Sequence, residues 1–383
     1  MAFDSRAARL LAVSVVFALG CGTEPQMMND PSTGAASSGS GSGSGSNLAV
    51  LGGCAVFDLI SDRPNAAANL DLDLIDPWGF AMDATDLYIA DNGTGALSIV
   101  DPNGVAATAS PARPMLDAGI DGIVRNTSET AFQLHTGSTA TGCAPASFLV
   151  SSESGKIWGV NLSLSPSPMV VVDRSAQRAV YKGLAIVAAP SGMRLVAADF
   201  HNARIDVFDD QFAPMPSGSF ADPSLPAGFA PFDVVAIGDR VYVSYAQQDQ
   251  DAMDDVPGPG LGQLDVFDPG GTLIRTLVAS GGALDAPWGL AMAPAAFCGS
   301  SGPELLAGNF GDGTIVAIDA GSGAVLGRLG TVGNHPIVID GLWGLGFGDG
   351  QDVGQADWLY FAAGPDMESH GQFGRIVPVT DPP

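Results

Sequence analysis

The stretch APWGLAM at residues 286–292 restates the pattern of DPWGFAM at 76–82, and GLWGLGF at 341–347 restates it again. In each copy Trp-Gly precedes a short apolar run, and a turn rich in Asp or Asn follows within a few dozen residues. A pattern that recurs along a chain is the sequence signature of a repeat architecture. The three copies therefore predict a fold built from repeated units.

Six units align along the chain, and each contains three short apolar runs. The first runs, which follow Gly or Pro or begin with a polar residue, are WGFAM (78–82), DGIV (121–124), KGLAIV (182–187), PFDVVAI (231–237), WGLAM (288–292) and WGLGF (343–347). The second runs, which end in small or polar residues, are LYIADN (87–92), FLVSSES (148–154), RLVAADF (194–200), RVYVSYA (240–246), ELLAGNF (304–310) and WLYFAAG (358–364). The third runs, which come after a turn, are ALSIVD (96–101), KIWGVN (156–161), RIDVFD (204–209), QLDVFD (263–268), TIVAID (314–319) and RIVPVT (375–380). Such runs between Gly, Asp and Pro predict strands, and no long stripe of helical period is present.

The units predict an all-β fold, a single six-bladed β-propeller made by residues 48–383. These 336 residues divide into about 56 per unit, slightly above the roughly 40 to 50 that are typical of propeller blades. A ring of blades leaves only short strand edges, provided that the two ends of the chain pair with each other. CAVFDLIS at 54–61 precedes the first unit, and the sixth unit contains only three runs. We therefore expect 54–61 to be the outer strand of the last blade and to close the ring.

Composition favours a turn-rich globular domain. Among 383 residues there are 51 Gly and 27 Pro, and a hydrophobic fraction of 46% is enough to form a core. The 41 acidic residues are 36 Asp and 5 Glu, and Asp favours turns whereas Glu favours helices. A net charge of −26 would repel a phosphate backbone, which argues against nucleic-acid binding. Cations and cationic partners remain open.

The first residues have the pattern of an export signal. Arg6 and Arg9 precede LLAVSVVFAL, an apolar run of 10 residues that is too short to span a bilayer. This pattern predicts a signal peptide over residues 1–20. We therefore expect the chain to be exported.

The end of this run resembles the lipobox of bacterial lipoproteins, in which a cysteine is lipidated. The residues are Ala18-Leu19-Gly20-Cys21, and Ala18 stands where leucine is usual, so cleavage by an ordinary signal peptidase is the alternative. The Gly/Ser-rich sequence within 21–47 predicts a disordered tether behind Cys21. The expected location is the bacterial cell envelope, at the outer membrane or cell surface, with the membrane as a partner through the lipid.

If Cys21 carries lipid, the remaining cysteines are Cys54, Cys143 and Cys298. Three thiols permit at most one disulfide, and the sequence does not decide which pair forms it. Their spacing is far from any zinc pattern.

The Trp-Gly pairs have two possible roles at the start of the innermost strand of a blade. In the first, glycine lets strands crowd near the axis and tryptophan fills the space between neighbouring blades. In the second, Trp78, Trp288 and Trp343 form an aromatic platform at the pore mouth for a sugar or an apolar ligand. Packing is the interpretation that we prefer.

Eleven stretches resemble a known family of uncharacterised bacterial exported proteins and lipoproteins, related to the NHL and TolB-like propellers. They are LISDRPNAA (59–67), DPWGFA (76–81), YIADNGTG (88–95), AVYKGLAI (179–186), AADFHNARIDVFD (197–209), GFAPFDV (228–234), DDVPGPG (254–260), APWGLA (286–291), GNFGDGTI (308–315), IDGLWGLGFG (339–348) and AAGPDMESHGQFG (362–374). The resemblance implies a six-bladed propeller but no particular activity. Some members look sorted by a C-terminal segment, whereas this chain ends in VTDPP.

Topology predicts that polar residues gather on one face of the propeller. In an up-and-down blade, the loop before the first strand and the loop between the second and third strands fall on the same face. The residues of these loops are Asp76, Asp91, Asn92, Asp121, Glu153, Asp199, His201, Asn202, Asn309, Asp312, Asp340, Asp366 and His370. The insertion QQDQDAMDDVPGPGLG (247–262) adds Asp249, Asp251, Asp254 and Asp255.

Oxygen ligands that converge on a pore would suit Ca²⁺, the one cofactor that the sequence suggests. The candidate ligands are Asp91, Asn92, Asp199 and Asn309. Such a site would be similar to that of the six-bladed calcium-dependent lactonases and phosphotriesterases, although DPWG offers Asp76 where those enzymes place a glutamate. The alternative is that ADNGTG and NFGDGT are hairpin turns in which Asn and Asp bond locally.

Two functions from different classes follow. The preferred one is a monomeric binding module whose acidic face holds a protein, a glycan or a small molecule. The alternative is a calcium-dependent hydrolase of lactones or phosphoesters. No catalytic residue can be assigned, although His201 and His370 on the candidate face are possible acid-base groups.

Overall fold

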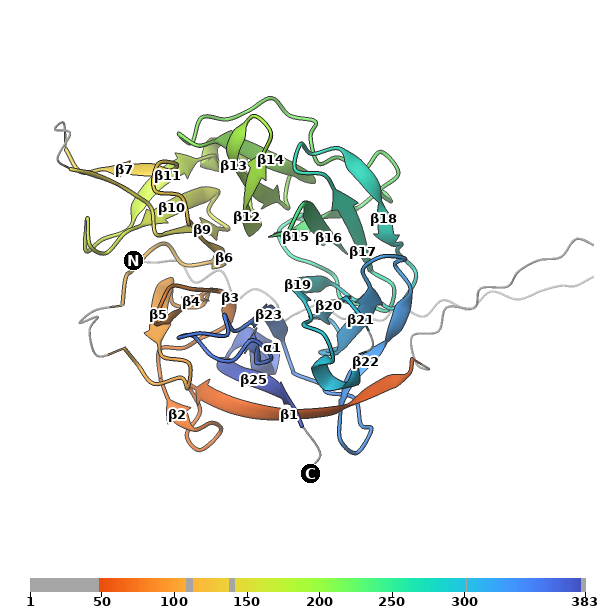
Figure 1. Ribbon diagram of the computed structural model, residues 1–383. Coiled ribbons are helices and arrows are strands. Elements are labelled where there is room, and N and C mark those ends of the chain that lie inside the picture. The colour runs from red at the N-terminus through yellow and green to blue at the C-terminus, as the bar shows by residue number, and fades with distance from the viewer. Residues whose placement is uncertain (1–47, 108–112, 138–141, 301, 380–383) are drawn as a thin grey trace, which may run out of the picture. The chain divides into compact units, whose positions relative to one another are not determined.

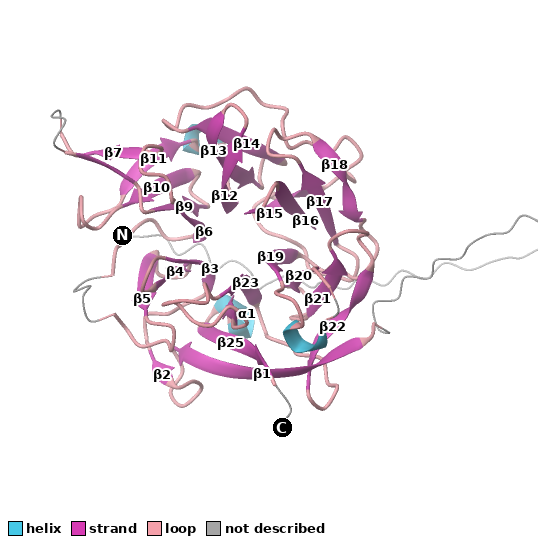
Figure 2. Cartoon of the chain, viewed as in Figure 1, coloured by secondary structure: helices cyan, strands magenta, loops and turns pink. Residues whose placement is uncertain are grey.

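The computed structural model describes residues 48–107, 113–137, 142–300 and 302–379. Nearly all regular structure in this part is strand, and the helical elements are single short turns (Figure 2). The all-β prediction is therefore confirmed. The predicted signal peptide, the lipidated Cys21 and the tether lie outside the described residues. In the part of the chain that the structure describes, no helix is long and apolar enough to cross a membrane.

The strands between residues 77 and 278 form four antiparallel sheets and a separate hairpin. The first sheet consists of β3 (Pro77–Met82), β4 (Leu87–Asp91) and β5 (Ala96–Val100). The second consists of β6 (Ile120–Arg125), β9 (Phe148–Ser152), β10 (Lys156–Val160) and β11 (Met169–Asp173). The third consists of β12 (Tyr181–Ala189), β13 (Gly192–Asp199) and β14 (Arg204–Asp209). The fourth consists of β15 (Phe229–Ile237), β16 (Arg240–Gln247), β17 (Gly262–Phe267) and β18 (Leu273–Val278), and the hairpin of β7 (Gln133–His135) and β8 (Cys143–Pro145).

The largest sheet contains strands from both ends of the described chain. One part of it is made by β19 (Pro287–Met292), β20 (Glu304–Asn309), β21 (Ile315–Asp319) and β22 (Val325–Thr331). The other part is made by β23 (Leu342–Phe347), β24 (Leu359–Ala363) and β25 (Gln372–Pro378), and the two-residue strand β2 (Asn69–Leu70) pairs with β1. The long strand β1 (Val50–Ser61) lies between the two parts.

Strand β1 connects the beginning of the described chain to its end. It pairs antiparallel with β25, with Cys54 opposite Pro378 and Ser61 opposite Gln372, and its first residues pair parallel with β22. A disulfide joins Cys54 to Cys298, which lies in a short 3-10 turn between β19 and β20. Both cysteines are buried, so the bond ties β1 into the core.

Six strands lie nearest the centre around which the sheets are arranged: β3, β6, β12, β15, β19 and β23 (Figure 1). The pairing register of each shifts near its start, which marks a β-bulge. In β3, for example, the shift falls between Pro77 and Phe80, so Trp78 and Gly79 are the bulged residues. Because a bulge bends a strand and re-aims its side chains, these residues face their neighbours around the centre.

The bulges place an equivalent pair of residues at the start of all six strands, and we call these pairs the axial dipeptides. They are Trp78-Gly79, Asp121-Gly122, Lys182-Gly183, Phe232-Asp233, Trp288-Gly289 and Trp343-Gly344. An aromatic residue holds the first position in four of them, and glycine holds the second position in five.

Glycine at the second position lets neighbouring strands approach closely. A Cβ atom on Gly79 would lie 2.6 Å from the carbonyl oxygen of Asp121, and one on Gly289 would lie 2.4 Å from that of Trp343. A Cβ atom on Gly344 would lie 2.5 Å from the carbonyl oxygen of Trp78, although these residues are far apart in the sequence. No side chain fits at such distances, so the packing role predicted for the glycines agrees with the structure.

The tryptophans at the first position pack against one another. Trp78 and Trp343 are stacked with 3.5 Å between ring centroids, and Trp288 meets Trp78 edge-on at 5.6 Å. Phe232 meets Trp78 at 6.3 Å and belongs to the same buried cluster. The three tryptophans are at most 4% exposed. They therefore fill the core near the centre, and the structure does not present them as an open aromatic platform.

Candidate functional site

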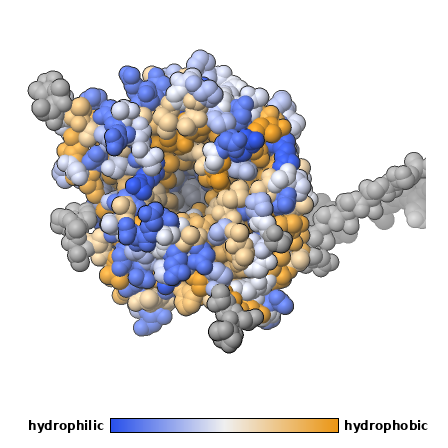
Figure 3. Space-filling model, viewed as in Figure 1, coloured by the Kyte–Doolittle hydropathy of each residue, from blue (hydrophilic) through white to orange (hydrophobic). Residues whose placement is uncertain are grey.

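Charged residues replace the aromatic residue in two neighbouring axial dipeptides, at Asp121 and Lys182. Around this pair lie polar side chains from several sheets, and we call the whole group the Lys182 cluster. Its members are Asp76, Asn92, Asp121, Glu153, Lys182, Asp254 and Asp255. The surface of the molecule is hollowed at the centre of the sheets, with hydrophilic residues along part of the rim (Figure 3).

Lys182 is completely buried and is the only cation of the cluster. Its Nζ forms an ion pair with Glu153 and a second one with Asp254, at 3.4 Å. The same ammonium lies 4.6 Å from the ring centroid of Trp78, which is a cation–π distance. Burial alone would lower the pKa of Lys182, but Glu153, Asp121 and Asp254 raise it well above its usual value. Lys182 is therefore charged at neutral pH.

Asp121 lies beside Lys182 and has an incomplete set of partners. Its side chain is fully buried, and Oδ1 accepts a hydrogen bond from Nδ2 of Asn92 at 2.7 Å. Its Oδ2 is buried and has no hydrogen-bond partner among the described residues. Burial and the nearby Glu153 raise the pKa of Asp121 well above its usual value, and Lys182 opposes this shift.

Asp76 connects the cluster to the tryptophans. Its two carboxyl oxygens accept hydrogen bonds from the indole Nε1 groups of Trp78, at 3.1 Å, and Trp343, at 3.2 Å. Burial raises the pKa of Asp76 well above its usual value, and Glu368 adds to the shift. Asp76 thus fixes two aromatic rings and holds a proton more readily than an exposed carboxyl group.

The insertion between β16 and β17 supplies the last two members. Burial raises the pKa of Asp255 to about 7, and its Oδ2 has no hydrogen-bond partner among the described residues. Asp254 pairs with Lys182, as described above. Of the other two acidic residues that the sequence places in this insertion, Asp249 accepts a hydrogen bond from the backbone of Met253 at 2.9 Å, and Asp251 is exposed. The insertion therefore reaches the cluster with only two of its four aspartates.

Three residues of the predicted face lie in hairpin turns of their own sheets. Asp91 is buried and accepts hydrogen bonds from Ser98, at 2.5 Å, and Arg113, at 3.3 Å. Nδ2 of Asn309 donates to Oδ1 of Asp312 at 3.1 Å. The contacts with Ser98 and Asp312 are the local ones expected of turns, whereas Arg113 comes from outside the hairpin of Asp91.

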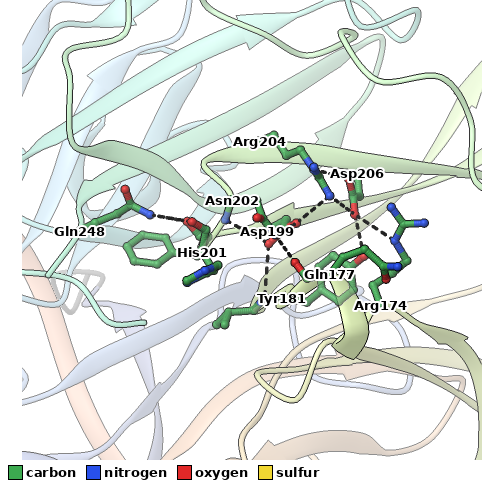
Figure 4. Close-up of polar contacts among 11 residues, drawn as sticks. Arg174, Gln177, Tyr181, Asp199, His201, Asn202, Arg204, Asp206 and Gln248 are labelled. Atoms are coloured by element: carbon green, nitrogen blue, oxygen red, sulfur yellow. Dashed lines mark hydrogen bonds and ion pairs between the residues drawn. The ribbon is translucent and has the colours of Figure 1, made fainter. Parts of the chain in front are cut away.

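Asp199, His201 and Asn202 belong to another network, at the end of β13 (Figure 4). Oδ2 of Asp199 accepts a hydrogen bond from Asn202 at 2.8 Å and pairs with Arg204 at 3.2 Å. Nδ1 of His201 lies 3.2 Å from the carbonyl oxygen of Ala252, in the insertion. This network is satisfied by its own members.

The last three residues of the predicted face lie near β25. Oδ2 of Asp340 accepts a hydrogen bond from the backbone N–H of Asp366 at 2.8 Å, and Asp366 pairs with Arg63 at 2.6 Å. Nδ1 of His370 lies 2.7 Å from Oδ2 of Asp62. Of the predicted face, only Asp76, Asn92, Asp121 and Glu153 thus come together, joined by Asp254 and Asp255 from the insertion.

The four residues considered as calcium ligands do not converge. Asn92 bonds to Asp121, whereas Asp91, Asp199 and Asn309 hold partners in separate turns. Among the described residues, no group of three or more His, Cys, Asp or Glu side chains is placed to hold a metal ion. In this geometry the four side chains bond to separate partners, and calcium binding stays a prediction.

Lys182 is the central residue that sequence reasoning missed. The signal was present, because KGLAIV aligns with WGFAM and WGLAM and so has lysine where three of the other units have tryptophan. Asp121 in DGIV and Asp233 in PFDVVAI break the same pattern, one at each position of the axial dipeptide.

Sheets arranged around a common centre, each with its first strand innermost, define the class of protein as a β-propeller. A solved protein of unknown function from Bacteroides thetaiotaomicron has a similar fold, with a TM-score of 0.51, 9% identity and alignment over 85% of this chain and 76% of that one. Virginiamycin B lyase from Staphylococcus aureus has a TM-score of 0.49, 11% identity and coverage of 85% and 99%. At these identities the likeness concerns the fold alone.

No protein-family model matches the chain. The uncharacterized protein R648 of Acanthamoeba polyphaga mimivirus is 32% identical over 333 residues, which cover 83% of this chain and 78% of the viral protein. The chain therefore belongs to the same family as this mimivirus protein. Because the relative is viral, the comparison does not support the bacterial origin that the sequence resemblance implied.

Proposed function

We propose that this chain is a six-bladed β-propeller that is exported, anchored to a membrane by lipid on Cys21, and used as a binding module. The six axial dipeptides favour six blades, one for each innermost strand. The pairing of β1 with β25 favours a ring closed by the two ends of the chain. The buried Cys54–Cys298 disulfide supports export, because disulfides persist in oxidising compartments.

The Lys182 cluster is the binding surface of this proposal, and its unequal charge is the observation that carries it. Asp76, Asp121, Glu153, Asp254 and Asp255 surround a single ammonium group. Oδ2 atoms of Asp121 and Asp255 are buried without partners among the described residues, and such groups cost free energy until a donor reaches them.

A cationic group of a ligand would supply that donor and that charge. Lysine or arginine of a protein, an amino sugar and a small amine all present such a group. The net charge of −26 would raise the local concentration of any of them near the molecule. The proposed activity is therefore recognition of a cationic group and requires no chemical step.

Titration calorimetry with the purified chain tests this proposal. The probes are spermidine and hexalysine, with hexaglutamate as the anionic control. We expect the cationic probes to bind and to weaken as salt rises, because charge contributes much of the attraction. Asp121→Asn keeps the shape of the side chain and should weaken binding by about tenfold or more, about 1.4 kcal/mol. Asp239→Asn is the matched control, because Asp239 is exposed and outside the cluster.

Equal affinity of the wild type and Asp121→Asn for spermidine would reject the cluster as the binding surface. A titration with Ca²⁺ distinguishes this binding function from the alternative, a calcium-dependent hydrolase. Heat from Ca²⁺ at one site, with none from spermidine or hexalysine, would overturn the proposal in favour of a metal-dependent hydrolase.

A further inference from the structure

The innermost strands also line a partly open cavity of about 200 Å³, whose wall is made by Trp288 and by residues that follow the first positions of the axial dipeptides. All six innermost strands contribute to its wall. The wall consists of glycines and of apolar side chains such as Ile123, Leu184, Leu290 and Leu345. No member of the Lys182 cluster lines it, so the cavity is a separate site.

Asp233 is the one charged side chain among the described residues that line this cavity. It holds the second position of its axial dipeptide, where the other five strands have glycine. The residue is only 6% exposed, and its Oδ1 accepts a hydrogen bond from the N–H of Val234 at 2.8 Å. No cation in the described part of the chain pairs with it.

A second polar group without a partner lies in the same wall. Trp288 is 4% exposed, and its indole Nε1 is buried with no hydrogen-bond acceptor among the described residues. The ring also offers a π-face of the kind that attracts ammonium groups. Asp233 and Trp288 come from different strands, β15 and β19, and both line the same cavity.

We propose that this cavity binds a small primary amine with an apolar body, with its ammonium group paired to Asp233. The carboxylate of Asp233 favours a cationic head group on the ligand, because an anion would be repelled and a neutral molecule would leave the carboxylate unpaired. The body of the ligand would contact the aliphatic side chains of the wall, such as Ile123, Leu184 and Leu290, between the polar backbone groups of the glycines. The volume of the cavity limits the ligand to about the size of one aromatic ring with a short chain, since an apolar cavity of roughly 150 Å³ already accepts benzene. A phenyl ring with a two-carbon aminoalkyl chain matches the class.

The state of Asp233 sets the pH dependence of this binding. Burial raises the pKa of Asp233 to about 7. The strands packed against β15 are β12, β13, β14, β16 and β19, and none of their titratable side chains lines the cavity wall. The amine stays protonated between pH 6 and pH 8, so only the carboxyl group changes. Affinity should therefore fall as pH falls below about 7, because protonated Asp233 no longer attracts the ammonium group.

Calorimetry with the purified chain tests the proposal with three probes of one shape: 2-phenylethylamine, neutral 2-phenylethanol and anionic phenylacetate. We expect the amine to bind at least tenfold more tightly than the alcohol, and phenylacetate to show no binding. Asp233→Asn keeps the acceptor for the Val234 N–H and should weaken amine binding at least tenfold, while Asp239→Asn should leave it unchanged.

Two results would overturn the proposal. One is equal binding of amine and alcohol, and the other is full amine affinity in Asp233→Asn. Loss of amine binding in Asp121→Asn with retention in Asp233→Asn would place the amine in the Lys182 cluster instead. If Asp233→Asn does not fold, the pH profile of the wild type decides. An affinity that does not change between pH 8 and pH 6 would then reject Asp233 as the partner.

Discussion

The Lys182 cluster and the Asp233 cavity both arise where the axial dipeptide departs from its usual aromatic-Gly pattern, but the buried charges of the cluster have charged partners, whereas the charge in the cavity has none among the described residues. At the first position, Asp121 and Lys182 replace aromatic residues in adjacent strands, so that a buried cation meets several carboxyl groups. At the second position, Asp233 replaces glycine and stands without a cation among the described residues. The first exception forms a network, whereas the second leaves a single carboxyl group whose pKa is near neutral. In this chain, the charges at the first position of the axial dipeptide acquire charged partners, whereas the charge at the second position does not.

The largest expected effect on the free energy of unfolding comes from a substitution that disrupts the Lys182 cluster. Lys182→Met keeps most of the side-chain volume but removes the cation that pairs with Glu153 and Asp254. Lys182 is fully buried, but Glu153 and Asp254 are 31% and 53% exposed, so of the carboxyl groups that face the ammonium Asp121 is the buried one that loses its opposing charge. Loss of one partner of a fully buried pair costs about 3–5 kcal/mol, and urea unfolding should therefore show a free energy of unfolding lower by about 3 kcal/mol, the lower limit of that range.

Lys156→Met is the matched control for Lys182→Met. Lys156 also pairs with a carboxylate, Asp117, at 2.7 Å, but its own side chain is 28% exposed, whereas that of Lys182 is fully buried. Such pairs contribute at most about 1 kcal/mol. Similar losses in the two variants would mean that burial does not distinguish the Lys182 network from an ordinary surface pair.

The second prediction concerns the isolated carboxyl group. The pKa of Asp233 is about 7 in the folded protein, against 3.8 ordinarily, so between these values the folded state binds more protons than the unfolded state. Stability from this group is therefore present below pH 4, is lost as pH rises toward 7, and is constant above 7. Asp233→Asn lacks this loss, so its free energy of unfolding relative to wild type should rise between pH 5 and pH 7. The limit is about 1.4 kcal/mol per pH unit.

Unfolding in urea at pH 5, 6, 7 and 8 measures this difference. Other groups titrate in both proteins and cancel in the comparison. A difference that stays constant across this range would show that Asp233 is ionised throughout, as an exposed aspartate would be.

The strands of both regions could be predicted from the sequence, but their chemistry could not. The three runs of each unit depend on neighbouring residues, so β3, β4 and β5 were recognised at 78–82, 87–92 and 96–101, with an error of one residue in each. Asp76 and Asn92 were placed on the right face because a blade has a fixed topology. The same argument put Asp91 and Asn309 there, although each bonds within its own turn.

The missed residues depend on neighbours that are distant in the sequence. Lys182 contacts Glu153 from the second sheet and Asp254 from the fourth, and only the assembled fold brings these together. Asp233 lies against Gly183 of the neighbouring strand, where a Cβ atom would come within 2.0 Å of its Oδ1. A repeat alignment could have marked both as exceptions to Trp-Gly. It could not have predicted that Lys182 would have charged partners and that Asp233 would have none among the described residues.

The smallest expected effect compares the tryptophans that adjoin the two regions. Nε1 of Trp343 donates to Asp76 of the Lys182 cluster, whereas Nε1 of Trp288 in the cavity wall has no acceptor among the described residues. Both substitutions Trp343→Phe and Trp288→Phe remove the same atoms from a buried site, and Trp343 is in addition stacked on Trp78 and Phe310. Only Trp343→Phe leaves a buried oxygen of Asp76 without its donor, which costs about 1–3 kcal/mol. Urea unfolding should therefore find Trp343→Phe less stable than Trp288→Phe by about 1 kcal/mol or more. Equal stabilities would mean that the bond to Asp76 contributes nothing, and that the cluster is held by its charges alone.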